Sequence, residues 1–253
     1  MKTSRAQQET TRAQIIRSSV DLMSRNGFDG VTMKEVARAA GIGDATIYKY
    51  FPTKERLLLG YFDLVAEEAI TAALETPGFD DYDLQAKLQR LTDAILERLL
   101  PDREFAVIAH ALFAKSPLLL LGDQLKAKQL LKDAALRLFD DAVNAQELPP
   151  SDFFRLMSGV YVDYCIGVVS YWLADKTPEF ADTTRLVDQT LGILVLLLKS
   201  GLPDRLVELG SFVLRSQLAR WLPSTDLATA PPRTKRPRAT SSASAARKAG
   251  RSK

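Results

Sequence analysis

Apolar residues recur every three or four positions along most of the chain, which is the period of an amphipathic α-helix. The first such stretch predicts a helix over Thr11–Arg25. Its apolar positions are Ala13, Ile16, Val20 and Met23. No segment shows the alternation of apolar and polar residues that is typical of a half-buried strand. The pattern therefore predicts an all-α protein.

Local signals then divide the chain into short helices. Gly27 is expected to end the first helix as an αL-type C-cap. Thr32 and Glu35 form a capping box, from which a second helix is expected to run to about Ala39. Gly41 stops that helix and can take the positive φ of a tight turn.

A third short helix is expected over about Asp44–Tyr50, where Pro52 ends it. Thr53 can cap a fourth helix over Lys54–Ala73. Further breaks at prolines separate six more segments with helical periodicity. The expected ranges are Leu84–Leu99, Glu104–Ala114, Leu118–Ala145, Asp152–Ala174, Thr183–Lys199 and Asp204–Trp221.

Charge is unevenly placed along the 253 residues. Residues 1–60 carry 10 Lys and Arg against 6 Asp and Glu, residues 61–226 carry 16 against 25, and residues 227–253 carry 8 against none. Both basic ends are candidate contacts for a polyanion, whereas the acidic middle would be repelled by DNA phosphates. The tail from residue 223 has almost no bulky apolar side chain, so we expect it to be disordered.

The short second and third helices have the pattern of a helix-turn-helix. Ile42 follows the turn at Gly41 and can fill the angle between the two helices, with Val36, Ala37 and Ile47 completing a small core. In this motif the second helix of the pair enters the major groove of DNA. A dinucleotide-binding loop at Gly41-Ile42-Gly43 is disfavoured, because Thr46 stands where a third glycine belongs and no strand precedes it.

Residues 11–62 resemble the DNA-binding domain of the tetracycline-repressor (TetR) family. The matching segments are Ile15-Ile16, Asn26-Gly27-Phe28, Val31–Ala37, Ala40-Gly41-Ile42 and Thr46–Leu58. The resemblance implies a homodimer that binds a palindromic operator in double-stranded DNA and responds to a small-molecule effector that the sequence does not identify. Together with the composition of the tail, it divides the chain into four expected segments: a flexible arm (1–10), the helix-turn-helix domain (11–58), a helical ligand-binding and dimerisation domain (59–222) and a disordered basic tail (223–253).

The resemblance assigns DNA-binding roles to individual positions. Thr32 is expected at a backbone contact, Lys34 at a base edge, and Lys54 at a phosphate beside a helix N-terminus. The remaining positions, all on the recognition helix, are Asp44, Ala45, Thr46, Tyr48, Lys49 and Tyr50. Gly43 departs from the serine or threonine expected as N-cap of that helix. Asp44 would suit a cytosine N4 donor, or it is only a favourable helix-start residue; both interpretations stay open.

Small or short residues lie on one face of the expected helix Asp152–Ala174, where another helix can approach closely. By resemblance, this helix and Thr183–Lys199 form the dimer interface; the alternative is that both fill a monomeric core. The interface positions are Gly159, Asp163, Gly167, Ser170, Thr190, Leu194 and Leu197.

His110, Tyr161 and Tyr164 lie among apolar residues and are candidate polar groups of a ligand pocket, although packing alone also explains them. Cys165 is expected to be an inert small side chain. No nucleophile elbow, P-loop or metal-binding motif is present, so we expect neither an enzyme nor a cofactor nor a metal. The prediction is a cytoplasmic, nucleoid-associated regulator without membrane contact, most simply a repressor released by a largely apolar effector. The alternative is an effector-independent architectural protein that uses the helix-turn-helix and the basic tail.

Overall fold

The computed structural model describes residues 4–115 and 125–201, which form helices and turns without a strand. All of them belong to one compact unit, Met1–Gly210. The predicted all-α fold class is confirmed for the described residues. The expected helix Asp204–Trp221 and the basic tail lie outside them.

Three helices form the N-terminal end of this unit: α1 (Arg5–Asn26), α2 (Met33–Ala39) and α3 (Asp44–Tyr50). The bounds of α2 and α3 agree with those predicted. α1 instead begins six residues before Thr11, because the Ser4 hydroxyl accepts a hydrogen bond from the backbone N–H of Gln7 (3.2 Å) and caps the helix there. Residues 5–10 are therefore helical and do not form the expected arm; this polar turn has no apolar periodicity to reveal it.

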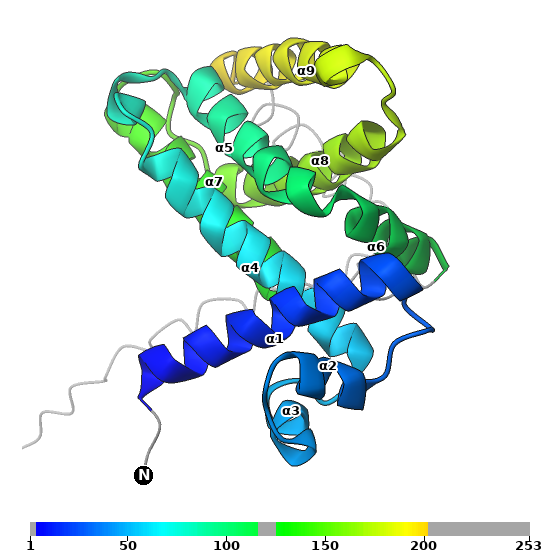
Figure 1. The fold of residues 1–253 in the computed structure, drawn as a ribbon. Coiled ribbons are helices and arrows are strands. Elements are labelled where there is room, and N and C mark those ends of the chain that lie inside the picture. The colour runs from blue at the N-terminus through cyan, green and yellow to red at the C-terminus, as the bar shows by residue number, and fades with distance from the viewer. Residues whose placement is uncertain (1–3, 116–124, 202–253) are drawn as a thin grey trace, which may run out of the picture. The chain divides into compact units, whose positions relative to one another are not determined.

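α4 spans Lys54–Leu74 and connects this end of the protein with the remaining helices (Figure 1). Thr53 caps it as predicted, since its hydroxyl accepts a hydrogen bond from the Arg56 amide (3.3 Å). The helix is continuous across residue 58, where the DNA-binding domain was expected to end. A movement of α4 therefore involves both regions of the protein.

The remaining helices make up a bundle. They are α5 (Leu84–Leu99), α6 (Arg103–Lys115), α7 (Lys126–Asn144), α8 (Phe154–Ala174) and α9 (Ala181–Lys199). Short 3-10 turns lie at η1 (Phe79–Asp81), η2 (Leu100–Asp102) and η4 (Pro178–Phe180). α5 has the predicted bounds, and α6, α8 and α9 differ from prediction by at most two residues at either end.

The predicted helix Leu118–Ala145 is confirmed only from Lys126, where α7 begins. Leu125 has an extended conformation (φ −73°, ψ 114°), so α7 does not continue through it. The part of the prediction over residues 118–124 lies outside the described residues.

The bundle core lies where α4 packs on α5 and α7, α7 on α8, and α5 on α9. Its largest fully buried side chains include Phe105, Phe139, Tyr161 and Trp172. α8 is long and apolar enough to cross a membrane, a test that the core helix of a soluble protein also passes. Here α8 contributes Tyr161 and Trp172 to the core of the bundle, and 39% of its most apolar window is buried.

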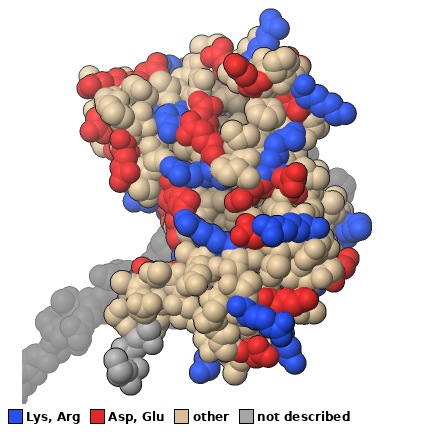
Figure 2. Space-filling model, in the orientation of Figure 1, with Lys and Arg blue, Asp and Glu red and all other residues tan. Residues whose placement is uncertain are grey.

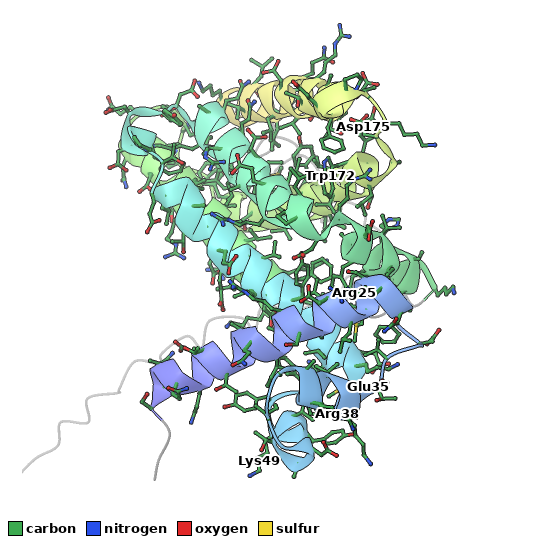
Figure 3. The ribbon with its side chains drawn as sticks, viewed as in Figure 1. Arg25, Glu35, Arg38, Lys49, Trp172 and Asp175 are labelled. Carbon is green, nitrogen blue, oxygen red and sulfur yellow. The ribbon has the colours of Figure 1, made fainter. Side chains whose placement is uncertain are left out.

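The turn between α8 and α9 is held by two polar side chains (Figure 3). The Arg103 guanidinium lies over the Trp172 ring, 5.3 Å from its centroid, and donates to the carbonyl oxygens of Leu173 (2.8 Å) and Asp175 (3.3 Å) at the end of α8. The Asp175 carboxylate accepts hydrogen bonds from the hydroxyl and amide of Thr183, and these bonds lower its pKa. These contacts fix the direction in which α9 leaves α8.

Candidate functional site

The turn between α2 and α3 has the predicted helix-turn-helix geometry. Gly41 has a φ of 66°, in the left-handed region that favours glycine. The Ile42 amide donates to the Ala37 carbonyl (3.0 Å) and closes the turn. From α1, the Gln14 side-chain amide donates to the Ala40 carbonyl (3.0 Å). The turn is thereby attached to the helix that lies across it.

A small core beneath the turn fixes the angle between α2 and α3. Val36, Ala37 and Ile47 are completely buried, as predicted, and Ile42 is half-buried against them. Because these side chains fill the space between the two helices, the outer face of α3 is presented as a rigid surface.

The outer face of α3 carries most of the residues predicted to contact DNA, and α2 adds Lys34. Lys34, Asp44, Ala45 and Lys49 are exposed, and 47% of Tyr48 is accessible to solvent. Figure 3 shows Lys49 at the end of the protein that lies away from the bundle. Thr46 and Tyr50 are half-buried, so only part of each is available to a ligand.

Thr32 is engaged within its own helix. Its hydroxyl accepts from the Glu35 amide (3.3 Å) and donates to the Glu35 carboxylate (2.8 Å), which also accepts from the Thr32 amide (2.8 Å). The bond from the Thr32 backbone, followed by that from its side chain, lowers the pKa of Glu35. A phosphate contact by Thr32 would compete with these bonds.

Lys54 points toward the loop after α1. Its ammonium donates to the Phe28 carbonyl (2.8 Å) and lies 4.6 Å from the centroid of the Phe28 ring. An ammonium group has three N–H donors, so this bond leaves others for a phosphate. In the unbound protein, Lys54 therefore also ties the start of α4 to the end of α1.

Charged side chains are arranged differently at the two ends of the protein (Figure 2). Basic and acidic groups are interspersed around α1, α2 and α3, with Lys34, Arg38 and Lys49 exposed there. Acidic groups gather over η1 and the start of α5, where Asp80 and Asp83 are exposed. Because phosphates are repelled by such a cluster, the end with α3 is the one that suits DNA.

α4, α5, α6, α7 and α8 surround a cavity of about 320 Å³. Most of its wall is apolar and includes Phe62, Ile95, Phe113, Val162, Ile166 and Val169. The polar side chains in the wall are Asp63, His110, Lys128, Cys165 and Ser170. A cavity of this size and lining falls at the lower end of the range for sites that bind small organic molecules.

Of the three predicted ligand-pocket residues, only His110 lies in this wall. Tyr161 is fully buried in the core, where its hydroxyl donates to the Leu88 carbonyl (2.9 Å), and burial raises its pKa. The Tyr164 hydroxyl lies 2.9 Å from that of Thr190. Both tyrosines therefore hold α8 against neighbouring helices, consistent with the packing alternative.

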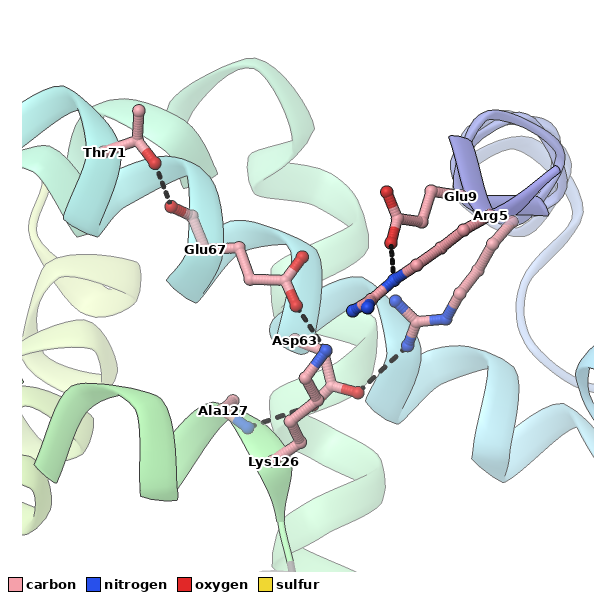
Figure 4. Close-up of polar contacts among 8 residues, drawn as sticks. Arg5, Glu9, Asp63, Glu67, Thr71, Lys126 and Ala127 are labelled. Atoms are coloured by element: carbon pink, nitrogen blue, oxygen red, sulfur yellow. Dashed lines mark hydrogen bonds and ion pairs between the residues drawn. The ribbon is translucent and has the colours of Figure 1, made fainter. Parts of the chain in front are cut away.

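Asp63 belongs to the cavity wall and also contacts the N-terminal helices. One carboxylate oxygen accepts from the Arg12 guanidinium on α1 (3.0 Å), and the other accepts from the Ala127 amide at the start of α7 (3.0 Å) (Figure 4). The Arg12 guanidinium also lies 5.5 Å from the ring centroid of Phe51, the residue directly after α3. A chain of contacts thus connects the cavity with the end of the recognition helix.

The close approach of Arg12 and Phe51 to α4 depends on Gly60. A Cβ atom added at Gly60 would lie 2.6 Å from the Phe51 ring and 3.4 Å from the Arg12 guanidinium. Any larger residue at this position would push the end of α3 away from α4.

The first turn of α7 is attached to two other helices. Lys126 forms an ion pair with Glu67 on α4, drawn in Figure 4, and the Lys128 ammonium donates to Asp163 on α8 (3.1 Å). The Lys128 side chain is 21% exposed and that of Asp163 72%. The start of α7 therefore lies where contacts from α4 and α8 meet beside the cavity.

The predicted interface positions lie along α8 and α9 with different exposures. Asp163, Gly167 and Leu197 are exposed; Gly159, Ser170, Thr190 and Leu194 are half-buried. An added Cβ at Gly159 or Gly167 would meet no atom within 4 Å, so both glycines border open space. Large apolar side chains are exposed on the same two helices: Leu156, Val160 and Tyr171 on α8, and Ile193, Leu196 and Leu197 on α9.

The sequence analysis did not identify Arg12, Asp63 or Lys128 as functional candidates. Arg12 and Asp63 are 51 positions apart, and Lys128 and Asp163 are 35 apart. Each is a single charged residue on an amphipathic helix, which is the ordinary composition of a solvated face. No local signal in the sequence distinguishes them.

Comparison with known proteins finds separate matches for the helix-turn-helix region and for the helical bundle. The sequence pattern described as "Bacterial regulatory proteins, tetR family" matches residues 15–61, and "Tetracyclin repressor-like, C-terminal domain" matches residues 87–213, half of the chain. The chain is 39% identical to the Fatty acid metabolism regulator protein of Bacillus subtilis over 19% of its own length and 25% of that protein. It is 31% identical to the HTH-type transcriptional repressor KstR of Rhodococcus jostii over 35% and 42% of the two chains.

These two alignments therefore cover only about a quarter and two fifths of the relatives' lengths. Likeness of fold extends further: the structure of Salmonella enterica GusR has a TM-score of 0.55 and 20% identity, with 79% of this chain and 100% of that chain covered. With the helix-turn-helix geometry and the match over half of the chain, the protein belongs to the TetR family of DNA-binding transcriptional regulators.

Proposed function

We propose that the protein is a homodimeric repressor that binds a palindromic operator and leaves it when a small, largely apolar molecule enters the cavity. The observation that carries this proposal is the position of Asp63, which belongs to the cavity wall and binds Arg12 of the DNA-binding region (3.0 Å). A ligand that displaces α4 or the start of α7 acts on this contact directly. It releases DNA only if it binds the DNA-free conformation more tightly.

Sequence-specific binding is supported by the rigid core beneath α3 and by the exposed polar face of that helix. The exposure of Lys34 and Lys49 supports contacts from their ammonium groups to base edges or phosphates, and that of Tyr48 supports donation of its hydroxyl to the DNA backbone. The half-buried Tyr50 supports the end of the helix more than it contacts DNA.

Dimerisation is supported by the exposed apolar side chains of α8 and α9. On α8 the glycines Gly159 and Gly167 leave room for a close approach of another helix, because an added Cβ at either would meet no atom of the described residues within 4 Å. A two-fold dimer places two recognition helices on successive turns of one DNA face, which requires a palindromic site. A location in the cytoplasm, with the DNA, follows from this function.

Selection of bound DNA from a random pool tests the first part of the proposal. The expected product is an imperfect palindrome bound by one dimer, as measured by sedimentation and fluorescence anisotropy. The alternative of an effector-independent architectural protein predicts no enriched site and complete displacement by excess random DNA.

The effector is sought by thermal-shift screening of apolar compounds, followed by the operator-binding assay. Asp63→Asn is the matched variant, because it keeps the size of the side chain and removes the charge that pairs with Arg12. It is expected to bind the same compounds but to show a smaller loss of operator affinity. Compounds that stabilise the protein and leave operator affinity unchanged would contradict ligand-controlled release.

A further inference from the structure

We propose that the cavity ligand is an amphipathic organic anion, whose apolar body fills the cavity and whose negatively charged head group binds Lys128. This inference rests on the proposed function, in which the cavity is the effector site. It adds the charge of the effector and the residue that selects it.

The other polar groups of the wall are largely occupied by partners within the protein. Both oxygens of Asp63 accept hydrogen bonds, and its negative charge is compensated by Arg12. The Ser170 hydroxyl donates to the Ile166 carbonyl (2.9 Å). Cys165 is buried, and burial raises the pKa of its thiol to about 12, so it is uncharged at neutral pH. None of these three offers a charge for a ligand to neutralise.

Lys128 differs from them because its partner, Asp163, is largely exposed to solvent. The Lys128 side chain is 21% exposed, whereas the Asp163 carboxylate that it contacts belongs to a side chain that is 72% exposed. An ion pair with such an exposed partner contributes little, because water competes for the carboxylate. The ammonium also has three N–H donors, of which Asp163 takes one.

If an anionic head group binds Lys128, the ammonium exchanges the hydrated Asp163 carboxylate for a partner at the edge of an apolar cavity. Charge-assisted hydrogen bonds are stronger where water is excluded. His110 belongs to the same wall on its solvent-exposed side, and its imidazole N–H is a second donor. A cationic head group is less favoured, since Arg12 already compensates the negative charge of the Asp63 carboxylate.

The wall around these groups determines the rest of the ligand. Phe62, Phe113 and Val169 are typical of it, and the volume of about 320 Å³ admits one hydrocarbon chain or a small ring system. We therefore choose decanoate as the probe, with 1-decanol and decylamine as ligands that share its chain and differ in charge.

The experiment measures the affinities of all three ligands for the full-length dimer by displacement of the neutral dye N-phenyl-1-naphthylamine. Decanoate is expected to bind about tenfold more tightly than 1-decanol, with decylamine the weakest, because one charge-assisted bond contributes a factor of this order. Binding of 1-decanol or decylamine at least as tight as that of decanoate would overturn the anion inference and leave the effector cavity standing. Failure of all three to displace the dye would contradict both.

Variants of the ion pair make the test specific to Lys128. Lys128→Met keeps the length of the side chain and should abolish the preference for decanoate over 1-decanol, whereas Lys128→Arg should retain it. Asp163→Asn removes the competing carboxylate and should raise decanoate affinity by a few fold without changing that of 1-decanol. Asp140→Asn, on an exposed position of α7, makes the same change of net charge and should alter neither affinity.

Sedimentation of each variant verifies that the dimer persists, since Asp163 is also a predicted interface position. A preference for decanoate that survives Lys128→Met would overturn the assignment of Lys128. Equal gains in decanoate affinity for Asp163→Asn and Asp140→Asn would show that net charge, and not release of Lys128, is responsible, and would overturn it as well.

Discussion

The helix-turn-helix is stabilised by contacts between residues close in sequence, whereas the cavity is bordered by contacts between residues far apart in sequence. In the helix-turn-helix, Thr32 and Glu35 are three residues apart, and the bond from Ile42 to Ala37 spans five. Around the cavity, Asp63 meets Ala127 across 64 positions and Lys128 meets Asp163 across 35. The first region is specified by neighbours in the sequence, whereas the second exists only after the chain has folded.

The two regions also differ in packing. The core between α2 and α3 is filled, and its central residues are completely buried. The bundle leaves about 320 Å³ open between five helices. A filled core favours one geometry, as a DNA-reading surface requires, whereas an unfilled one can exchange conformations at low cost. α4 belongs to both regions, and the proposed function requires that a change around the cavity reach the DNA-binding helices through it.

The largest effect is expected from the same substitution made once in each region, which tests the difference in packing. Ile47 is completely buried beneath α3, and Ile95 is 5% exposed in the cavity wall. Ile47→Ala should lower the free energy of unfolding by about 2–5 kcal/mol and abolish operator binding. Ile95→Ala should cost less, because that side chain already borders empty space, and should leave operator affinity in the absence of ligand unchanged. Chemical denaturation and anisotropy measure both; equal losses would refute the difference in packing.

Two tyrosines of similar exposure test whether the surfaces of the regions differ in function. Tyr48 on α3 is 47% exposed and Tyr171 on α8 is 44% exposed. Tyr48→Ala should weaken operator binding about tenfold at unchanged dimer affinity, through loss of a contact with the DNA backbone. Tyr171→Ala should instead weaken the dimer and lower DNA binding only at low protein concentration. If Tyr48→Ala weakened the dimer in sedimentation and Tyr171→Ala weakened operator binding in anisotropy, the two surfaces would have been assigned the wrong way round.

Removing one helix cap from each region has a smaller effect. Thr32 caps α2, and Asp83 caps α5 by accepting from the Ala86 amide (2.9 Å). Either replacement by alanine should cost about 0.5–2 kcal/mol of stability. Only Thr32→Ala should also weaken operator binding, since α2 has only seven residues and supports the recognition helix α3. Thr32→Ser keeps the hydroxyl and should retain both stability and operator binding. If it does not, Thr32 acts by something other than its capping hydroxyl.

The smallest effect is expected from the basic segment beyond both regions. Residues 227–253 contain eight Lys and Arg and no acidic residue. A chain ending at residue 223 should keep the same preferred operator, but the slope of log K against log salt should become shallower by about 2–4, because fewer phosphates are neutralised. Identical slopes for the full and shortened chains would mean that the segment does not bind DNA.

The agreement between sequence and structure follows the range of the contacts. The bounds of α2 and α3 agreed because capping residues, glycine and proline act on their immediate neighbours. α5 was equally predictable from its strong amphipathic period. The start of α1 was missed, since a polar first turn carries no periodicity, and the extended backbone at Leu125 was not foreseen because it interrupts no apolar pattern.

For the candidate sites, the difference between what the sequence predicted and what the structure added is larger. Exposed positions on α3 followed from the short motif, and the structure added that Thr32 and Lys54 already have partners in the unbound protein. His110 was placed in the cavity wall, but the two tyrosines grouped with it support the core. A polar residue among apolar ones indicates burial, and the direction of burial depends on helices elsewhere in the chain.

By itself the sequence determined the all-α fold, the helix-turn-helix and the residues that α3 leaves exposed. These depend on hydrogen bonds and turns within a few residues, which the order of the amino acids specifies directly. Only the tertiary structure decided that Asp63 joins a cavity to Arg12, and that Lys128 lies beside that cavity with an exposed partner. Such a site is formed by single residues of separate helices, and their meeting is settled by how those helices pack.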